Sequence, residues 1–181
     1  MGISTGPHAR LAVFGEELIE IHRRLRSELS RLRADVDSYL AGHGDRPRDL
    51  KTHCVAFCSA LTAHHTGEDA GAFPVLAETF PELQPIIAKL VEDHVLVSGI
   101  LRRLTELLGA IGHEPDAAEA VRVRGELDGL AAILESHFSF EERRIVTALN
   151  SLPSDVATLA GLLGELGEAW PSQDHDVSPR M

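Results

Sequence analysis

Two copies of the pattern HxxxE stand out among the residues whose types could do chemistry. Glu68 follows His64 by four positions, and Glu141 follows His137 by the same spacing. Residues four apart lie on one face of a helix, one turn above the other, and both pairs continue an apolar stripe. An unpaired carboxylate in an apolar interior is costly, so it takes up a proton or binds a cation. The two patterns therefore indicate a buried cation site.

Two further histidines, His22 and His94, occupy apolar positions of other predicted helices. No Lys or Arg lies on the inward stripes to pair with the two carboxylates. Imidazole suits divalent transition-metal ions, and carboxylates can bridge two such ions in the core of a helix bundle. The next residue after His64, His65, points about 100° away around the helix, so whether it joins the site is left open. The candidate metal ligands are His22, His64, Glu68, His94, His137 and Glu141.

An internal repeat supports this reading. The segment 18–32 aligns with 90–104 at a shift of 72, which superimposes His22 on His94. The segment 64–76 aligns with 137–149 at a shift of 73, which superimposes one HxxxE pattern on the other. Two helix hairpins are therefore predicted to carry the same polar residues at equivalent places.

Four long helical patterns must position these residues. In the first and third, apolar residues recur in alternating steps of three and four, the spacing of a bundle seam. The segment 73–85, with its two Phe-Pro steps, is expected to break the chain twice. The predicted fold is all-α: an up-down-up-down four-helix bundle over residues 7–152, a short C-terminal helix (153–168) and a flexible tail (169–181). The expected long helices are 7–40, 48–71, 85–111 and 116–149.

Composition and charge disfavour several classes of function, among them nucleic-acid binding and membrane insertion. The 181 residues fit one domain, and a net charge of −11 makes nucleic acid a poor partner. No apolar run is long enough to span a membrane, and the N-terminus lacks the apolar core of a signal peptide. We therefore expect a cytoplasmic protein that does not bind membranes. We expect it to be a monomer or a weak homodimer. The two cysteines, Cys54 and Cys58, are expected to be free thiols.

The order His, HxxxE, His, HxxxE, with Phe-Pro five residues after the first Glu, resembles the hemerythrin-like, or HHE cation-binding, family. The resemblance covers about residues 11–149. It implies a four-helix bundle that holds a non-haem, carboxylate-bridged pair of iron ions. It also implies three roles: one iron on His22 and His64, the other on His94 and His137, and bridges from Glu68 and Glu141.

Two departures from that family pattern matter. Oxygen-carrying hemerythrins have HxxxH on the third helix, whereas Ser98 stands four residues after His94 here. They also end in HxxxxD, whereas this chain has the shorter HxxxE at 137–141. The implied centre is poorer by one imidazole, and open positions favour binding and turnover of a small oxidant such as O₂, H₂O₂ or NO.

Two other functions remain open from the sequence. The chain could be an iron- or oxygen-responsive sensor or binding module without turnover of its own. It could also be a bundle in which zinc or iron has a structural role only. General-base or nucleophilic chemistry finds little support, because no Ser–His–Asp arrangement, glycine-rich phosphate loop or CxxC motif is present.

Overall fold

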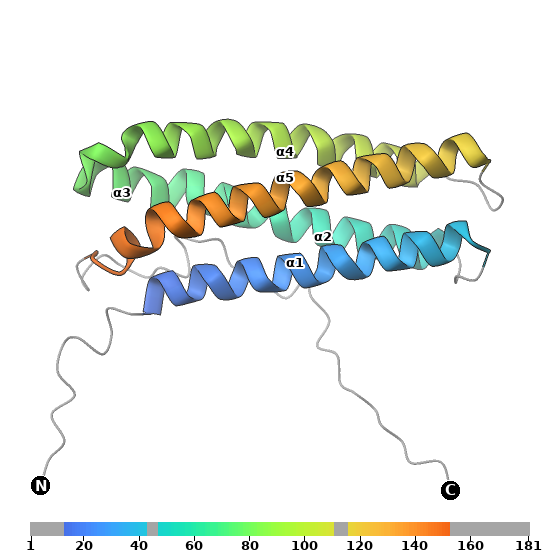
Figure 1. Cartoon of the computed structure of the whole chain (residues 1–181), viewed down its shortest axis with the longest axis horizontal. Helices are drawn as coiled ribbons and strands as arrows, with labels where there is room; N and C mark the ends of the chain where they lie inside the picture. Colours follow the sequence, from blue (N-terminus) through green and yellow to red (C-terminus); the bar gives the residue numbers. More distant parts are fainter. Residues whose placement is uncertain (1–12, 43–46, 111–115, 153–181) are drawn as a thin grey trace, which may run out of the picture.

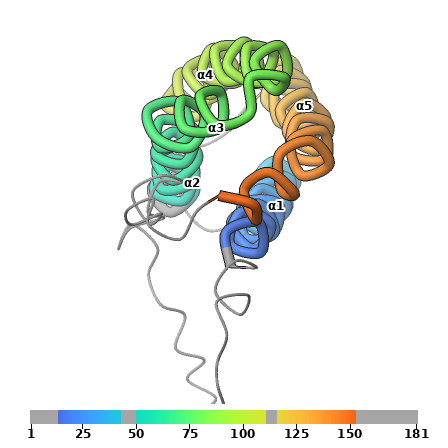
Figure 2. The backbone as a smooth tube through the Cα atoms, turned by 90° about the vertical axis from the view of Figure 1, so that its left-hand side faces the viewer, coloured from blue at the N-terminus to red at the C-terminus, as the bar shows by residue number. Residues whose placement is uncertain are grey.

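Each long helix of the chain buries one apolar stripe. The computed structural model describes residues 13–42, 47–110 and 116–152. Figure 1 shows four long helices, α1, α2, α4 and α5, running antiparallel to their chain neighbours, with the short α3 at one end of the bundle. Seen along the bundle in Figure 2, they enclose a common core. Each long helix packs against two others, in the order α1, α2, α4, α5 and back to α1. The predicted up-down-up-down four-helix bundle is confirmed.

The first helix, α1 (Val13–Leu40), carries the seam that the sequence predicts. It ends in a turn where Gly42 has φ 76°, a backbone conformation that suits glycine. On the third long helix, α4 (Gln84–Ala110), the seam residues within the described range are likewise buried. The α1 seam residues, each at most 5 % exposed, are Leu18, His22, Leu25, Leu29, Leu32 and Val36.

The second helical stretch differs from the prediction. It does not end near residue 71: α2 (Pro47–Gly67) continues through a π-helical segment, η2 (Glu68–Ala72), into α3 (Phe73–Thr79). Pro74 does not break the helix because it falls in the first turn of α3, directly after the widened π segment, where a missing N–H is tolerated. The chain breaks once, at Phe80, whose φ of −129° and ψ of 79° leave the helical region.

A short 3-10 turn, η3 (Pro81–Leu83), leads from this break into α4. The last long helix, α5 (Ala117–Leu149), begins with a capping box. The Asp116 side chain accepts a hydrogen bond from the Glu119 backbone N–H, and the Glu119 side chain accepts one from the Asp116 N–H. The helix therefore starts where the sequence predicts.

Several expectations fall outside the described residues. These are the predicted start of the first helix at residues 7–12, the short C-terminal helix at 153–168 and the tail at 169–181. Within the described residues, no helix is both long and apolar enough to cross a membrane. The two cysteines are free thiols, as expected, with Cys54 buried and Cys58 half-buried.

Candidate metal centre

The bundle core contains a polar cluster drawn from all four long helices and η2. His22 lies on α1, His64 on α2 and His94 on α4, each in a seam position between apolar neighbours. Their side chains and those of the remaining candidates are at most 3 % exposed. The structure thus brings together all six residues that the sequence singles out: His22, His64, Glu68, His94, His137 and Glu141.

The four histidines meet in two pairs. The Nε2 atoms of His22 and His64 lie 3.0 Å apart, and those of His94 and His137 lie 3.2 Å apart. Two nitrogens bound about 2.1 Å from one ion lie about 3.0 Å apart at octahedral angles and about 3.4 Å apart at tetrahedral angles. Each pair, called here the His22–His64 pair and the His94–His137 pair, therefore has the spacing of two ligands of one ion.

The Glu68 carboxylate spans the two pairs. Its Oε1 lies 3.4 Å from Nε2 of His64, and its Oε2 lies 3.5 Å from Nε2 of His94. One oxygen thus faces each pair. A carboxylate in this position can bridge two ions that the pairs hold.

Glu141 spans the same two pairs from the opposite hairpin. Its Oε2 lies 3.4 Å from Nε2 of His22 and 3.5 Å from Nε2 of His137. Both glutamates are completely buried, and none of their four carboxylate oxygens has a hydrogen-bond partner among the described residues. Buried, unsatisfied carboxylates are rare in folded proteins, and a bound cation would satisfy them.

Burial controls the ionisation of this cluster in the metal-free chain. It raises the pKa of Glu68 well above its usual value, and the negative charge of Glu141 adds to the rise. It likewise raises the pKa of Glu141 to about 8. Burial lowers the pKa of His137 to about 3, and the pKa of His22 falls for the same reason. The metal-free core therefore favours neutral imidazoles and neutral carboxyls.

Two carboxylates outside the cluster orient its histidines. Nδ1 of His22 donates to Glu142 Oε1 at 2.9 Å, and Nδ1 of His94 donates to Asp69 Oδ1 at 2.8 Å. The hydrogen bonds from His22 and Arg26 hold the pKa of Glu142 at about 2, so this carboxylate can only accept. With the proton on Nδ1, each imidazole turns its Nε2 lone pair into the cluster, as a metal ligand requires.

The sequence prediction missed these two carboxylates, although a signal for them exists. Asp69 follows Glu68 directly, and Glu142 follows Glu141 directly, so the two are related by the same shift of 73 as the HxxxE patterns. Each hairpin therefore supplies a buried glutamate and, one residue later, a carboxylate that orients a histidine of the other hairpin.

Aromatic rings fix the orientation of the same two histidines. His22 stacks on Phe138, with ring centroids 4.0 Å apart and an angle of 18° between the planes. His94 stacks on His65, with ring centroids 3.9 Å apart and planes at 8°. The Phe73 ring also stacks on His94, with centroids 5.4 Å apart and planes at 19°. His65, left open by the sequence, is thus part of the cluster and only 4 % exposed.

The π-helical segment begins at Glu68 itself. Glu68 and Ala72 are buried within it, and Phe73 is buried directly after it. π-helical turns inside longer helices occur frequently at functional sites. In the second hairpin the equivalent Glu141 lies within uninterrupted α-helix, so the two halves of the cluster differ in backbone as well as in side chains.

Among the described residues, two groups have ligand atoms close enough together to hold a metal ion: His22, His64 and Glu68, and His65, His94 and His137. A family model, the hemerythrin HHE cation-binding domain, matches residues 14–149. Comparison with curated proteins and with solved structures gives no match. The matched range includes the four long helices, except the first residue of α1, and every residue of the cluster. On this match, the chain belongs to the hemerythrin family of HHE cation-binding domains.

Proposed function

We propose that the polar cluster binds two non-haem iron ions, and that this pair binds or reacts with a small oxidant: O₂, H₂O₂ or NO. The His22–His64 pair would hold one ion and the His94–His137 pair the other. Glu68 and Glu141 would bridge them. The observation that carries the proposal is the position of Glu68, which directs one carboxylate oxygen to each histidine pair.

The donor set fits iron. Two imidazoles and two carboxylates would give each ion four protein ligands, which is fewer than the six that octahedral iron accepts. The chain has no third imidazole four residues after His94, because Ser98 stands there. Positions not filled by protein are where a small ligand binds.

Iron in such a pair supplies exchangeable coordination positions and one-electron redox chemistry. The chain's own residues provide the rest. Asp69 and Glu142 keep the Nε2 lone pairs of His94 and His22 turned inward. The apolar seam above and below the cluster excludes bulk water, which strengthens electrostatic interactions inside it.

Metal analysis and ligand addition test the proposal together. We expect protein purified from iron-supplemented cells to contain about two iron ions per chain. Adding azide to the oxidised protein, or NO to the reduced protein, should produce new visible absorption bands, and H₂O₂ should be consumed. Protein that contains mostly zinc or no metal, or that has iron but responds to none of these reagents, would contradict the proposal.

A further inference from the structure

His65, Gly67 and Ser98 are among the positions around the cluster at which the two hairpins of the repeat differ. His65 corresponds to Phe138 and Gly67 to Phe140 under the shift of 73, and Ser98 corresponds to Arg26 under the shift of 72. All three differences change the surroundings of the two histidine pairs. They make one half of an otherwise repeated centre distinct from the other.

The first difference exchanges a benzene ring for an imidazole in the same packing position. Phe138 stacks on His22 at 4.0 Å, and His65 stacks on His94 at 3.9 Å, both with nearly parallel planes. The packing therefore requires a flat ring at this place, and phenylalanine provides one in the other hairpin. Packing alone does not explain the polar nitrogens of His65.

Those nitrogens lie close to the proposed centre. Nε2 of His65 is buried and has no hydrogen-bond partner among the described residues. A ring nitrogen of His65 lies within 4.8 Å of ligand atoms of His94 and His137. Leaving a buried donor or acceptor unsatisfied destabilises the folded chain, so a partner supplied from outside the chain would stabilise this arrangement.

The stacking shows what kind of partner fits. A histidine binds a metal through a lone pair in the plane of its ring. Because the His65 and His94 planes are 8° from parallel and their centroids are 3.9 Å apart, the in-plane lone pairs of the two rings lie in separate, nearly parallel planes. As placed, His65 therefore does not share an ion with His94. It can still form a hydrogen bond to a small ligand of that ion.

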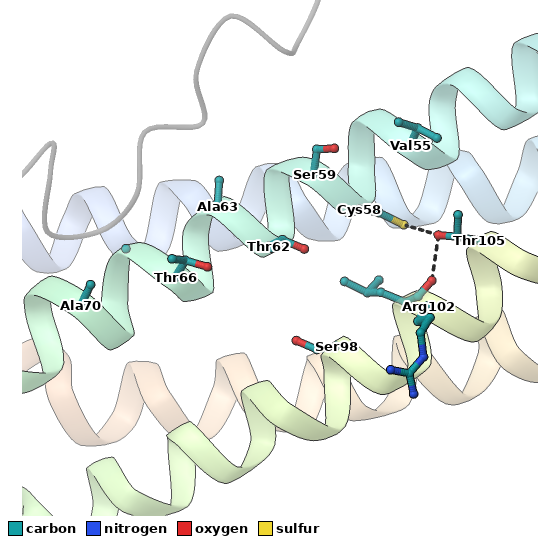
Figure 3. A pocket seen from close by; sticks show the side chains of 12 residues that line it. Val55, Cys58, Ser59, Thr62, Ala63, Thr66, Ala70, Ser98, Arg102 and Thr105 are labelled. Atoms are coloured by element: carbon teal, nitrogen blue, oxygen red, sulfur yellow. Dashed lines mark hydrogen bonds between the residues drawn. The ribbon is translucent and has the colours of Figure 1, made fainter.

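The other two differences lie on the face of the bundle between α2 and α4. In the His22 half, Arg26 lies over the Phe138 ring at 5.2 Å and is ion-paired with Glu135 and Glu142. In the His94 half, Ser98 replaces the arginine and lines a groove of about 920 Å³ between α2 and α4. Gly67 lines it as well. In Figure 3, Ser98 on α4 lies across this α2–α4 groove from Thr62 and Thr66 on α2.

We propose that the exogenous ligand binds on the His94–His137 side of the centre, and that His65 donates a hydrogen bond to it from Nε2. The ligand class is a small anion or diatomic oxidant with an exposed lone pair. This inference rests on the proposed di-iron function and adds to it which half binds the ligand and which residue recognises it.

The test measures azide binding to oxidised, iron-loaded full-length protein by absorption titration. His65→Phe copies the residue of the other hairpin, so it keeps the stacked ring and removes the donor. His65→Gln restores an N–H donor. His53→Phe makes the same substitution three turns away on α2, where the half-buried His53 pairs with Glu28 and Asp35, and serves as the control.

We expect His65→Phe to keep about two irons per chain and to raise the azide Kd about tenfold or more, the range for a hydrogen bond to a charged group. His65→Gln should recover most of that loss, and His53→Phe should match the unsubstituted protein. An unchanged azide Kd in His65→Phe would overturn the inference, as would a His65→Gln variant no better than His65→Phe. Loss of one iron in His65→Phe would also overturn it, because His65 would then be a ligand. If the unsubstituted protein binds no iron pair, the proposed function itself fails.

Discussion

Asp69 accepts a hydrogen bond from Nδ1 of His94 at 2.8 Å, although the two residues lie on different helical segments, η2 and α4. The contact couples the π-helical turn that contains the buried Glu68 to the histidine of the next long helix. Glu142 makes the equivalent contact to His22 from α5 to α1. The centre is thus held by two such links, each between an acidic residue of one hairpin and a histidine of the other.

Removing the Asp69 link should weaken metal binding without unfolding the bundle. Asp69 is 38 % exposed, so Asp69→Ala leaves no buried cavity. It removes the acceptor that holds the proton on Nδ1 of His94, so the ring can change tautomer. We expect the metal affinity to fall about 10–100-fold, measured by competition with a chelator. Asp128→Ala, which breaks an exposed ion pair with Arg33, is the control. Equal affinity in both variants would show that Asp69 does not orient a ligand.

The stability of the metal-free protein should fall as the pH rises above neutrality. Burial raises the pKa of Glu141 from 4.5 to about 8, so between these values the folded chain holds a proton that the unfolded chain has lost. The buried histidines act in the opposite direction, but only below about pH 6.5, where the unfolded imidazole charges. Between pH 6.5 and 8 we expect the free energy of unfolding to drop by about 2 kcal/mol, measured by urea denaturation.

Two comparisons check the origin of this pH dependence. The variant Glu141→Leu should reduce the slope between pH 6.5 and 8, because its unfolding no longer involves the Glu141 proton. Metal-loaded protein should lack the loss as well, because metal binding favours the deprotonated carboxylate. A free energy of unfolding that rises over this range in the metal-free protein would show that the buried carboxyls are ionised without a metal.

Exchanging a buried carboxyl for leucine should separate stability from metal binding. Glu141 is fully buried with no hydrogen-bond partner among the described residues. Replacing a buried polar group that has no hydrogen-bond partner by an apolar side chain of similar volume removes the cost of leaving that group unsatisfied, about 1–3 kcal/mol. We expect metal-free Glu141→Leu to unfold at higher urea concentration while it no longer binds two irons. A destabilised variant that still binds two irons would argue against a bridging role.

Filling the α2–α4 groove should slow ligand entry. Ser98→Arg copies the residue that covers the other half of the centre. We expect unchanged iron content and a slower azide association rate in stopped-flow absorption. Val95→Arg, at a site on α4 that is 70 % exposed and not among the groove residues, should behave like the unsubstituted protein. Equal rates for the two variants would exclude this groove as the route.

The sequence predicts the fold well because the helical period determines which residues are buried. His22 shares its stripe with five apolar residues of α1, and all six are buried. The internal repeat adds the relation between the hairpins, since superimposing the HxxxE patterns already pairs Glu68 with Glu141. The structure places these residues together, and their role as metal ligands remains the proposal to be tested.

Three features of the structure could not be predicted from the helical period of the apolar residues alone. The π-helical segment at Glu68–Ala72 widens the helix just before Pro74, so that the helix continues past a proline that would ordinarily indicate its end. His65 lies off the seam by one residue and is buried because it stacks on a side chain of another helix. Asp69 is exposed enough to read as a surface residue; the repeat relates it to Glu142, and its hydrogen bond to His94 shows its role.

Electron paramagnetic resonance combined with iron analysis tests the central claim most directly. Two ferric ions bridged by Glu68 and Glu141 should couple magnetically. Oxidised protein with two irons per chain should therefore show almost no ferric signal, and Glu68→Leu should lose iron or show a ferric signal. One iron per chain, zinc in place of iron, or two irons with the full signal of isolated ferric ions would contradict a carboxylate-bridged pair in this bundle.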